Sequence, residues 1–453
     1  MERLLIVNAR IVNEGHITEG DVLIEGGRIA AIGGAFAADI RQEQVLDAKG
    51  QFLLPGMIDH YVHFREPGET LIADMAAESA AAVAGGVTSF LDSPDLVSGT
   101  RTLAALEEKV QLATGRARAN FGFYLGAGRD NLELIQSLDP CSACGINIYL
   151  GCDTENDERL LDDRESIEAV FRDAPLIVCA HCEDMPTIIE NEEGYRNIYA
   201  EQVPLEFHPV IRSESACMIA TRLALELAGQ YDTRLHIMHV STAAQLELLS
   251  EAELAEKKIT AAVCPQHLHF SDEDYATCGA LIKYNPAIKT AEDRAALIQG
   301  LLDGRLDVVG SGHAPQLLEQ KQNQGYFDTP SGIPMVQYSL LTLLENYHDG
   351  IFSMPLIAQK TSHAPAEIFN IHKRGYIREG YWADLVLVDV ERGGVATHSN
   401  SLSRCGWTPF DGYKFRSTIA STLVNGQLVW HDGRIQDIRP GGLALEYDRA
   451  GLT

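Results

Sequence analysis

Short apolar runs alternate with longer helical patterns through the middle of the chain. Stretches rich in Ala, Leu and Glu separate the runs, with clear helical patterns at 74–84 and 213–229. Eight strand–helix units predict a (β/α)8 barrel, and an open doubly wound sheet is the alternative. The eight runs are MIDHYVHF (57–64), VTSFLD (87–92), ANFGFYLG (119–126), GINIYLG (145–151), LIVCAH (176–181), LHIMHV (235–240), ITAAVC (259–264) and DVVGSGH (307–313).

Both ends of the chain have a different pattern, in which short β-like runs are separated by glycine turns. LLIVNARIV and GDVLIEGGRIAAIGG lie near the N-terminus, and similar runs lie at 381–389 and 421–432. We expect residues 1–54 and 378–453 to form one small β-sandwich domain beside a barrel domain of residues 55–377. Two unrelated hairpins are the alternative.

Composition and charge exclude several classes of function. The 453 residues include 36 basic and 64 acidic side chains, giving a net charge of −28 and no basic cluster. This charge argues against nucleic acid or an anionic membrane as a partner. No run of apolar residues is long enough for a membrane span, and no signal peptide is recognisable. Nine cysteines, an odd number spread thinly, predict a reducing, cytoplasmic compartment.

Histidines stand at the ends of four predicted barrel strands. They are His63, His181, His239 and His313. Because the C-terminal ends of barrel strands meet at one face, these side chains are expected to converge there. A single histidine at a strand end is usually structural, but four on separate strands favour a metal site, present or ancestral.

The motif MIDHYVHFREPG resembles the first-strand motif of the dihydroorotases of the amidohydrolase superfamily, Asp-x-His-x-His followed by Phe-Arg-Glu-Pro-Gly. The resemblance runs in order over nearly the whole chain. Its further motifs are AGGVTSFLDSPD (84–95), AHCED (180–184), LHIMHVST (235–242), KYNPAIKT (283–290), GHAPQ (312–316) and GYIREGYWADLVLVD (375–389).

The resemblance implies a barrel whose C-terminal end holds one or two zinc ions. In that family the ligands are two first-strand histidines, a carboxylated lysine or an aspartate after strand four, histidines on strands five and six, and a strand-eight aspartate. A metal-bound hydroxide attacks the cyclic amide, and the strand-eight aspartate carries the proton to the leaving nitrogen. On this pattern His63, His181 and His239 match metal ligands, whereas Arg65 and Asn285 match residues that hold the substrate carboxylate.

Five positions depart from the family pattern. Tyr61 replaces the first histidine, Asn147 replaces the bridging lysine, and Gly312 replaces the catalytic aspartate. Asp95 stands where a substrate-binding asparagine is usual, and Gln316 replaces a histidine. If Asp95 and Arg65 both face the mouth, Asp95 competes for the arginine and disfavours an anionic ligand.

The departures weaken both metal binding and chemistry. Without the bridging carbamate, two dications would repel each other, so we expect at most one zinc, held by His63, His181 and His239. Asp153 after strand four is a weaker candidate ligand. Glycine cannot transfer a proton, so Gly312 removes an acid–base contribution of about 10²–10⁴-fold.

Two neighbouring histidines do not make up these losses. Strand alternation should turn His60 away from Tyr61 and His63, unless a bulge or a register slip interrupts the run at 57–64. The same alternation should turn His313 away from position 312.

The resemblance and the departures together favour a dihydroorotase-like protein with a degraded metal site, non-catalytic or weakly active. One alternative is an active one-zinc dihydroorotase or other cyclic amide hydrolase of pyrimidine biosynthesis. Another is a protein that binds a cyclic amide or carboxylate, or that assembles with a carbamoyltransferase. We also expect a homo-oligomer, with a dimer as the simplest form.

Overall fold

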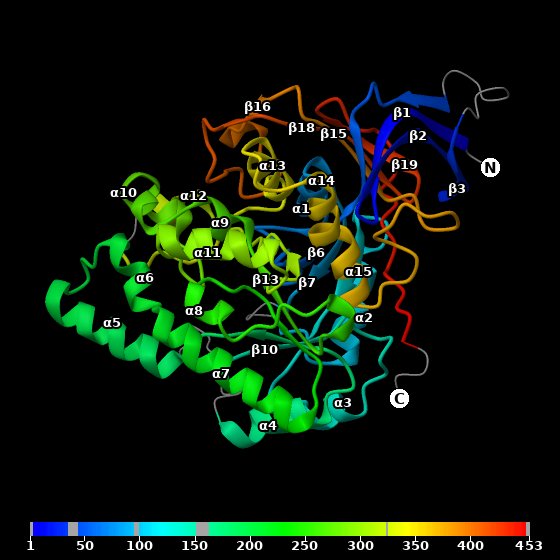
Figure 1. The fold of residues 1–453 in the computed structure, drawn as a ribbon. Coiled ribbons are helices and arrows are strands. Elements are labelled where there is room, and N and C mark those ends of the chain that lie inside the picture. The colour runs from blue at the N-terminus through cyan, green and yellow to red at the C-terminus, as the bar shows by residue number, and fades with distance from the viewer. Residues whose placement is uncertain (1–2, 35–43, 95–98, 151–162, 323–324, 450–453) are drawn as a thin grey trace.

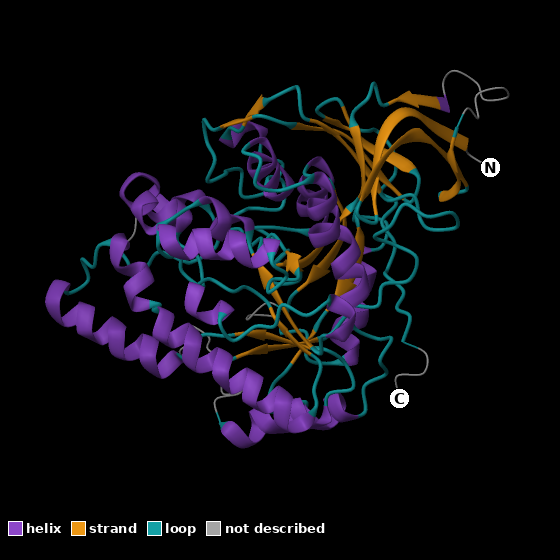
Figure 2. Ribbon diagram, viewed as in Figure 1, coloured by secondary structure: helices purple, strands orange, loops and turns teal. Residues whose placement is uncertain are grey.

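The structure is a computed structural model, and its polypeptide forms a barrel with a sheet beside it (Figure 1). Figure 2 shows the helices lying around the barrel strands, with the additional sheet to one side. The described residues are 3–34, 44–94, 99–150, 163–322 and 325–449.

All eight predicted apolar runs form parallel barrel strands. β8 and β9 are two parts of one strand, since β8 pairs with β7 and β9 pairs with β10. The strands are β6 (Met57–Val62), β7 (Val87–Asp92), β8 (Asn120–Phe123), β9 (Leu125–Gly126), β10 (Ile146–Tyr149), β11 (Val178–His181), β12 (Leu235–Ile237), β13 (Ile259–Val263) and β14 (Val308–Val309).

The ring of strands closes between the first and the last strand. Val62 pairs with His313 in parallel, and the backbone N–H of His63 donates to the carbonyl of His313 at 2.7 Å. This closure confirms the (β/α)8 barrel and makes the open doubly wound sheet wrong.

Fifteen α-helices occur among the described residues, and the two helices predicted most clearly begin at side-chain caps. Asp74 caps α1 and Ser213 caps α7 by accepting backbone N–H bonds. The helices are α1 (Met75–Ala84), α2 (Leu103–Ala113), α3 (Leu132–Gln136), α4 (Arg164–Asp173), α5 (Met185–Tyr199), α6 (His208–Ile211), α7 (Glu214–Tyr231), α8 (Ala243–Leu246), α9 (Pro265–His269), α10 (Tyr275–Cys278), α11 (Ala291–Leu302), α12 (Leu318–Gln322), α13 (Ser339–His348), α14 (Met354–Ala358) and α15 (Ala364–Ile368). None of these described helices is both long and apolar enough to cross a membrane.

Strands from both ends of the chain form one sheet, in the order β20-β19-β18-β15-β5-β1-β2-β3, with β4 beside β1. A separate small pair joins β16 and β17. The strands are β1 (Arg3–Asn13), β2 (His16–Glu25), β3 (Arg28–Gly33), β4 (Val45–Asp47), β5 (Phe52–Pro55), β15 (Leu385–Asp389), β16 (Gly394–Val395), β17 (Lys414–Phe415), β18 (Thr418–Val424), β19 (Gln427–His431) and β20 (Arg434–Ile435).

The terminal sheet folds back on itself around its own apolar core. The edge strand β3 bonds to the segment before β15, through Ile29 N–H to Tyr381 O at 2.9 Å. Buried side chains of both chain ends, such as Ile24 and Leu387, share one cluster inside it. The two ends therefore meet as expected, and two unrelated hairpins are ruled out. The boundaries at 54/55 and 377/378 stay a prediction.

Candidate functional site

Tyr61 and three of the four predicted strand-end histidines meet at the C-terminal end of the barrel, which we call the mouth. The Tyr61 hydroxyl lies 3.2 Å from His63 Nε2, and the Tyr61 ring centroid lies 5.1 Å from that of His239. His239 Nε2 in turn lies 3.0 Å from His181 Nδ1. The convergence predicted from the strand ends is thus present for His63, His181 and His239.

Glu183 and Arg212 complete this group, and the sequence reasoning did not single them out. Glu183 Oε2 lies 2.9 Å from His181 Nε2 and accepts a bond from Arg212 Nη1 at 2.7 Å. Glu183 is completely buried and Arg212 nearly so. A carboxylate two residues after a strand-end histidine, within the AHCED motif, was the signal that could have found Glu183.

The bond to Glu183 places one proton on His181. A carboxylate only accepts, so His181 Nε2 carries the proton that is donated to Glu183. The Nδ1 atom of His181 then faces His239 Nε2, and one of these two nitrogens donates to the other. Burial, and next the neighbouring His181, hold the pKa of His239 well below its usual value, which keeps that ring neutral.

The described side chains do not fit a resident zinc ion. The facing nitrogens of His181 and His239 resemble a ligand pair, but His63 Nε2 is bonded to the Tyr61 hydroxyl. Within the described part of the chain, no three His, Cys, Asp or Glu side chains are grouped so as to hold a metal. Catalytic zinc sites need three protein ligands. The expected one-zinc set of His63, His181 and His239 is therefore not assembled.

Asn147 occupies the place of the bridging lysine and faces the barrel interior. Its Nδ2 atom lies 3.0 Å from the Met238 sulfur, and the side chain is almost fully buried. Its Oδ1 atom has no hydrogen-bond partner among the described residues. A neutral amide at this position supplies neither an anionic bridge nor an amine that could carry a carbamate.

Gly312 lies in a backbone conformation and a space that suit only glycine. Its φ is +59°, and a Cβ atom there would lie 2.3 Å from the Tyr284 hydroxyl and 2.7 Å from the Cys264 sulfur. Both neighbours are buried and neutral, because burial raises the pKa of Tyr284 and of Cys264 well above the usual values. The volume that an aspartate would need is filled, so the loss of the proton carrier involves more than one residue.

His313 does not join the other three histidines, so the expected convergence is wrong for this residue, because both of its ring nitrogens bond to groups outside the mouth. Its Nε2 atom lies 2.9 Å from Glu78 Oε2 on α1, and its Nδ1 atom accepts the backbone N–H of Met335 at 3.0 Å. Ser403 also donates to Glu78, at 2.6 Å. His313 therefore links the barrel to α1 and to the segment before α13, which is a structural role.

His60 also enters the barrel, although alternation predicted that it would turn away from Tyr61. The pairing of β6 with β7 shifts between Asp59 and Val62, and this irregularity breaks the alternation. The His60 ring lies 5.0 Å from that of His236 on β12 and does not reach the mouth. The expected orientation was wrong, but His60 still adds no ligand to the mouth.

The candidate substrate-binding residues are only partly described. Arg65 Nη1 donates to Glu69 at 3.0 Å, and its Nη2 points to the carbonyl of Pro315 just after β14, at 3.5 Å. Asn285 follows Tyr284, whose carbonyl bonds to His208 Nε2 at 2.8 Å. The candidates Asp95 and Asp153 lie outside the described residues.

Buried lysines lie on the same side of the barrel as Asn285. Lys283 Nζ donates to the carbonyls of Tyr326 and Thr329, at 2.6 and 2.7 Å. Burial, and next the charge of Arg212, lower the pKa of Lys283 to about 7. Burial, and next the charge of Lys283, lower the pKa of His208, and Lys289 acts in the same direction. These cations therefore lie close together.

Comparison with known proteins agrees with the motif resemblance. The model of the amidohydrolase family matches residues 52–429 of the chain. The dihydroorotases of Methanosarcina acetivorans and Methanosarcina mazei are 28% and 29% identical to it over 450 residues. These alignments cover 97% of this chain and 94% and 97% of the two relatives.

Solved structures share the whole fold. The L-hydantoinase (dihydropyrimidinase) from Arthrobacter aurescens superimposes with a TM-score of 0.92 at 24% identity, covering 98% of this chain and 100% of that one. The dihydropyrimidinase from Brevibacillus agri NCHU1002 gives a TM-score of 0.89 at 24% identity, with 98% of both chains covered. At this level of identity the likeness establishes the fold alone.

Proposed function

The chain belongs to the amidohydrolase family, and from that premise we propose that its mouth binds a small cyclic amide or carboxylate without the metal-dependent hydrolysis typical of that family. The observation that carries the proposal is the state of His181. Both of its ring nitrogens are engaged, Nε2 with Glu183 and Nδ1 with His239. A metal ion at this pair would have to displace a hydrogen bond and would still lack a third ligand among the residues that the structure describes.

The filled space at Gly312 supports the same conclusion. Hydrolysis of an amide needs a group that gives a proton to the leaving nitrogen. The atoms next to Gly312 are the Tyr284 hydroxyl and the Cys264 thiol, and burial raises the pKa of both groups. Neither is tuned to accept and return a proton near neutral pH.

The charge around the mouth favours an acidic ligand. Arg65 is retained at the position that holds the substrate carboxylate in the resembling family, and Lys283 adds an amine whose pKa burial lowers to about 7. A planar guanidinium binds a carboxylate through two parallel bonds. Dihydroorotate, which is both a cyclic amide and a carboxylate, is therefore the first ligand to test.

The test combines metal content, turnover and binding on protein purified without chelators. We expect less than one zinc in ten chains, no hydrolysis of dihydroorotate above the buffer blank, and binding of dihydroorotate by calorimetry that weakens in Arg65→Gln. Zinc at one ion per chain together with turnover would overturn the proposal. Absence of binding as well as turnover would remove the ligand-binding part and leave only the loss of hydrolysis.

A second candidate is an active hydrolase that uses one zinc ion. One observation favours it, namely that His181 Nδ1 and His239 Nε2 face each other at 3.0 Å while Glu183 holds the outer nitrogen of His181. Carboxylates commonly hold metal-binding histidines in this way. Titration with Zn²⁺ separates the candidates, because only this one predicts activity that rises to a plateau at one ion per chain.

A role in assembly rests on the family resemblance alone and is the remaining proposal. The partner would be a carbamoyltransferase, and the chain itself would form a dimer. Light scattering of the purified chain, alone and mixed with a carbamoyltransferase from the same source, tests both parts. A single species with the mass of one chain in both samples would contradict them.

A further inference from the structure

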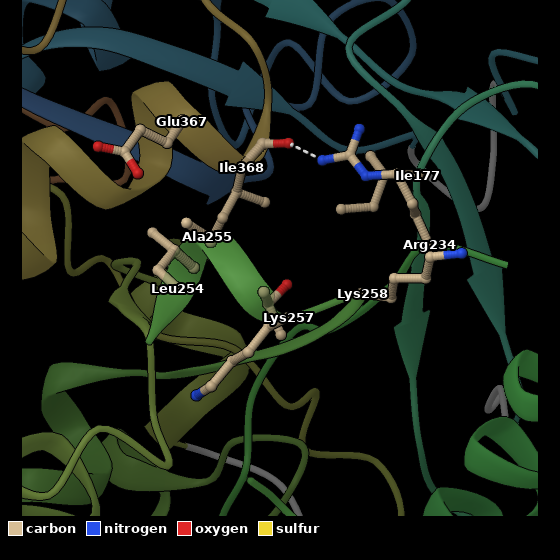
Figure 3. Close-up of a pocket in the computed structure, with 9 residues that line it drawn as sticks. Ile177, Arg234, Leu254, Ala255, Lys257, Lys258, Glu367 and Ile368 are labelled. Atoms are coloured by element: carbon tan, nitrogen blue, oxygen red, sulfur yellow. Dashed lines mark hydrogen bonds between the residues drawn. The ribbon is translucent and has the colours of Figure 1, made fainter. Parts of the chain in front are cut away.

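A cleft of about 250 Å³ opens at the N-terminal end of the barrel, opposite the mouth. It lies where β11, β12 and β13 begin, beside the end of α15 (Figure 3). Its lining residues are Ile177, Arg234, Leu254, Ala255, Lys257, Lys258, Thr260, Glu367 and Ile368. Nothing in the proposed function uses this cleft.

Arg234 is the charged group at one end of the cleft. Its Nη1 donates to the Asn370 side-chain oxygen at 3.1 Å, and its Nη2 donates to the Ile368 carbonyl at 2.8 Å. Both described partners are neutral. Figure 3 shows the guanidinium beside the Ile368 carbonyl at the rim of the open space. Arginine has five N–H groups, so further donors remain for a ligand.

A second arginine behind Arg234 strengthens the positive charge. Arg449 is buried and donates to four backbone carbonyls, those of Pro140, Ala143, Cys144 and Phe369. Its buried Nε atom has no partner among the described residues. Burial, and next the charge of Arg449, lower the pKa of Arg234, which reports two guanidinium groups close together. An anion in the cleft would relieve this repulsion.

The two lysines of the lining are already neutralised. Lys257 Nζ lies 2.8 Å from Asp307, and Lys258 Nζ lies 2.5 Å from Asp232. Their charged ends bind these carboxylates, so mainly their aliphatic stems face the cleft. Among the basic residues of the lining, Arg234 is the one whose described partners include no carboxylate.

The rest of the lining is mostly polar and includes three apolar side chains, Ile177, Leu254 and Ile368. The Thr260 hydroxyl, which also belongs to the lining, lies 2.8 Å from His236 Nδ1. The one acidic group of the lining, Glu367, has its carboxylate bonded to the Tyr376 hydroxyl. Sites for drug-sized ligands begin at about 300 Å³, so this cleft suits a smaller molecule.

From these contacts we infer that the cleft binds a small organic carboxylate, with its anionic group on Arg234 and its apolar body against Ile177, Leu254 and Ile368. The site is independent of the mouth, so it holds whether or not the chain hydrolyses an amide. The inference names a second ligand site at the end of the barrel opposite the family's chemistry.

Benzoate and its neutral isostere benzamide are the probes, titrated into the full chain by ligand-observed NMR and calorimetry. We expect benzoate to bind with a millimolar Kd and benzamide to bind at least ten-fold more weakly. Arg234→Gln should weaken benzoate at least ten-fold, and Arg234→Lys should weaken it less. Arg164→Gln, at an exposed arginine on α4, is the matched control and should leave the Kd unchanged.

Arg234 also holds the end of α15, so its replacement could lower stability. Ala255→Phe covers this case, since it fills the cleft from an exposed position and leaves Arg234 in place. It should abolish benzoate binding while the thermal midpoint stays unchanged. The inference is overturned if benzoate at about 20 mM, enough to saturate a millimolar site, does not bind the wild-type chain. It is equally overturned if benzamide matches benzoate, or if Ala255→Phe retains the affinity.

Discussion

The two halves of the mouth keep their side chains in place in different ways. On the β11–β12 side, Glu183, His181 and His239 form a continuous hydrogen-bonded chain anchored by Arg212. On the β6–β14 side, the Tyr61 hydroxyl lies 3.2 Å from His63 Nε2, and Gly312 is surrounded at short range by Tyr284 and Cys264. A chain of hydrogen bonds links the first side, whereas close packing around a glycine marks the second.

This difference shows which loss is easily reversed and which is not. The facing nitrogens of the histidine pair lie 3.0 Å apart, and a metal there would need a further ligand and would have to displace the bond between them. The β14 side would need a new backbone conformation at Gly312 and smaller side chains around it. Replacing Gly312 by the family's aspartate is therefore not sufficient to restore the proton carrier.

The largest loss of stability should come from a variant that breaks the hydrogen bonds on the β11–β12 side of the mouth. Glu183→Gln removes the negative charge that faces Arg212 and His181 inside the barrel, and breaking a buried ion pair typically costs about 4 kcal/mol. Urea unfolding at pH 7 measures the loss. Glu226→Gln, in the exposed pair with Arg164, is the control and should not change the midpoint. Equal midpoints for both variants would mean that the buried network does not hold this half together.

The crowded half should respond to a single methyl group. Gly312→Ala places a side chain at φ +59° and within 2.3 Å of the Tyr284 hydroxyl, so we expect a loss of about 3 kcal/mol from backbone strain and overpacking together. Gly350→Ala isolates the backbone part, because φ is +72° there and no atom lies within 4 Å; its cost should be about 1 kcal/mol. If both variants lose the same stability, the space around Gly312 is not filled as described. Adding Tyr284→Phe to Gly312→Ala should recover part of the difference.

Acid should destabilise the fold through buried histidines near both halves. Burial lowers the pKa of His60 to about 3 and that of His267 to about 4, below the unfolded value near 6.5. Below pH 6.5 the unfolded chain therefore binds more protons than the folded chain. Each of these histidines then lowers the free energy of unfolding by about 1.4 kcal/mol per pH unit, until the pH reaches its folded pKa. Asp59, whose pKa burial raises to about 6, acts in the opposite direction between about pH 4 and 6.

His60→Leu tests this pH dependence. Neither ring nitrogen of His60 has a partner among the described residues, so the variant should lose little stability at pH 7. Between pH 7 and pH 5.5 it should lose about 1.4 kcal/mol less than the wild type, as measured by urea unfolding. If the free energy of unfolding of the variant relative to the wild type is the same at both pH values, His60 takes up its proton in the folded state.

The smallest effect concerns the contact between Tyr61 and His63. Tyr61→Phe removes a hydroxyl that lies 3.2 Å from His63 Nε2, and a hydrogen bond of this kind contributes about 1 kcal/mol. Thermal unfolding measures this loss of stability. Tyr199→Phe, at an exposed position, is the control. A loss above about 3 kcal/mol would contradict the view that this half depends on packing more than on hydrogen bonds.

Much of the fold was predictable because hydrophobic periodicity reports local structure. The runs at 87–92 and 259–264 appear as β7 and β13 with nearly the predicted bounds. The site was less predictable. His60 was misplaced because a register shift in β6 arises from pairing with β7, which the alternation of one strand does not contain. The roles of Asp95 and Asp153 stay a prediction, since both lie outside the described residues.

The amino-acid sequence alone determined the barrel and the meeting of the two chain ends, and it predicted the departures from the family pattern at Tyr61, Asn147 and Gly312. These follow from periodicity, glycine turns and residue identity, which are properties of the chain read in order. Only the tertiary structure decided that Glu183 occupies the outer nitrogen of His181 and that other side chains fill the space beside Gly312. Hydrogen-bond partners and free volume depend on atoms brought together from distant strands, and closure of the barrel sets those distances.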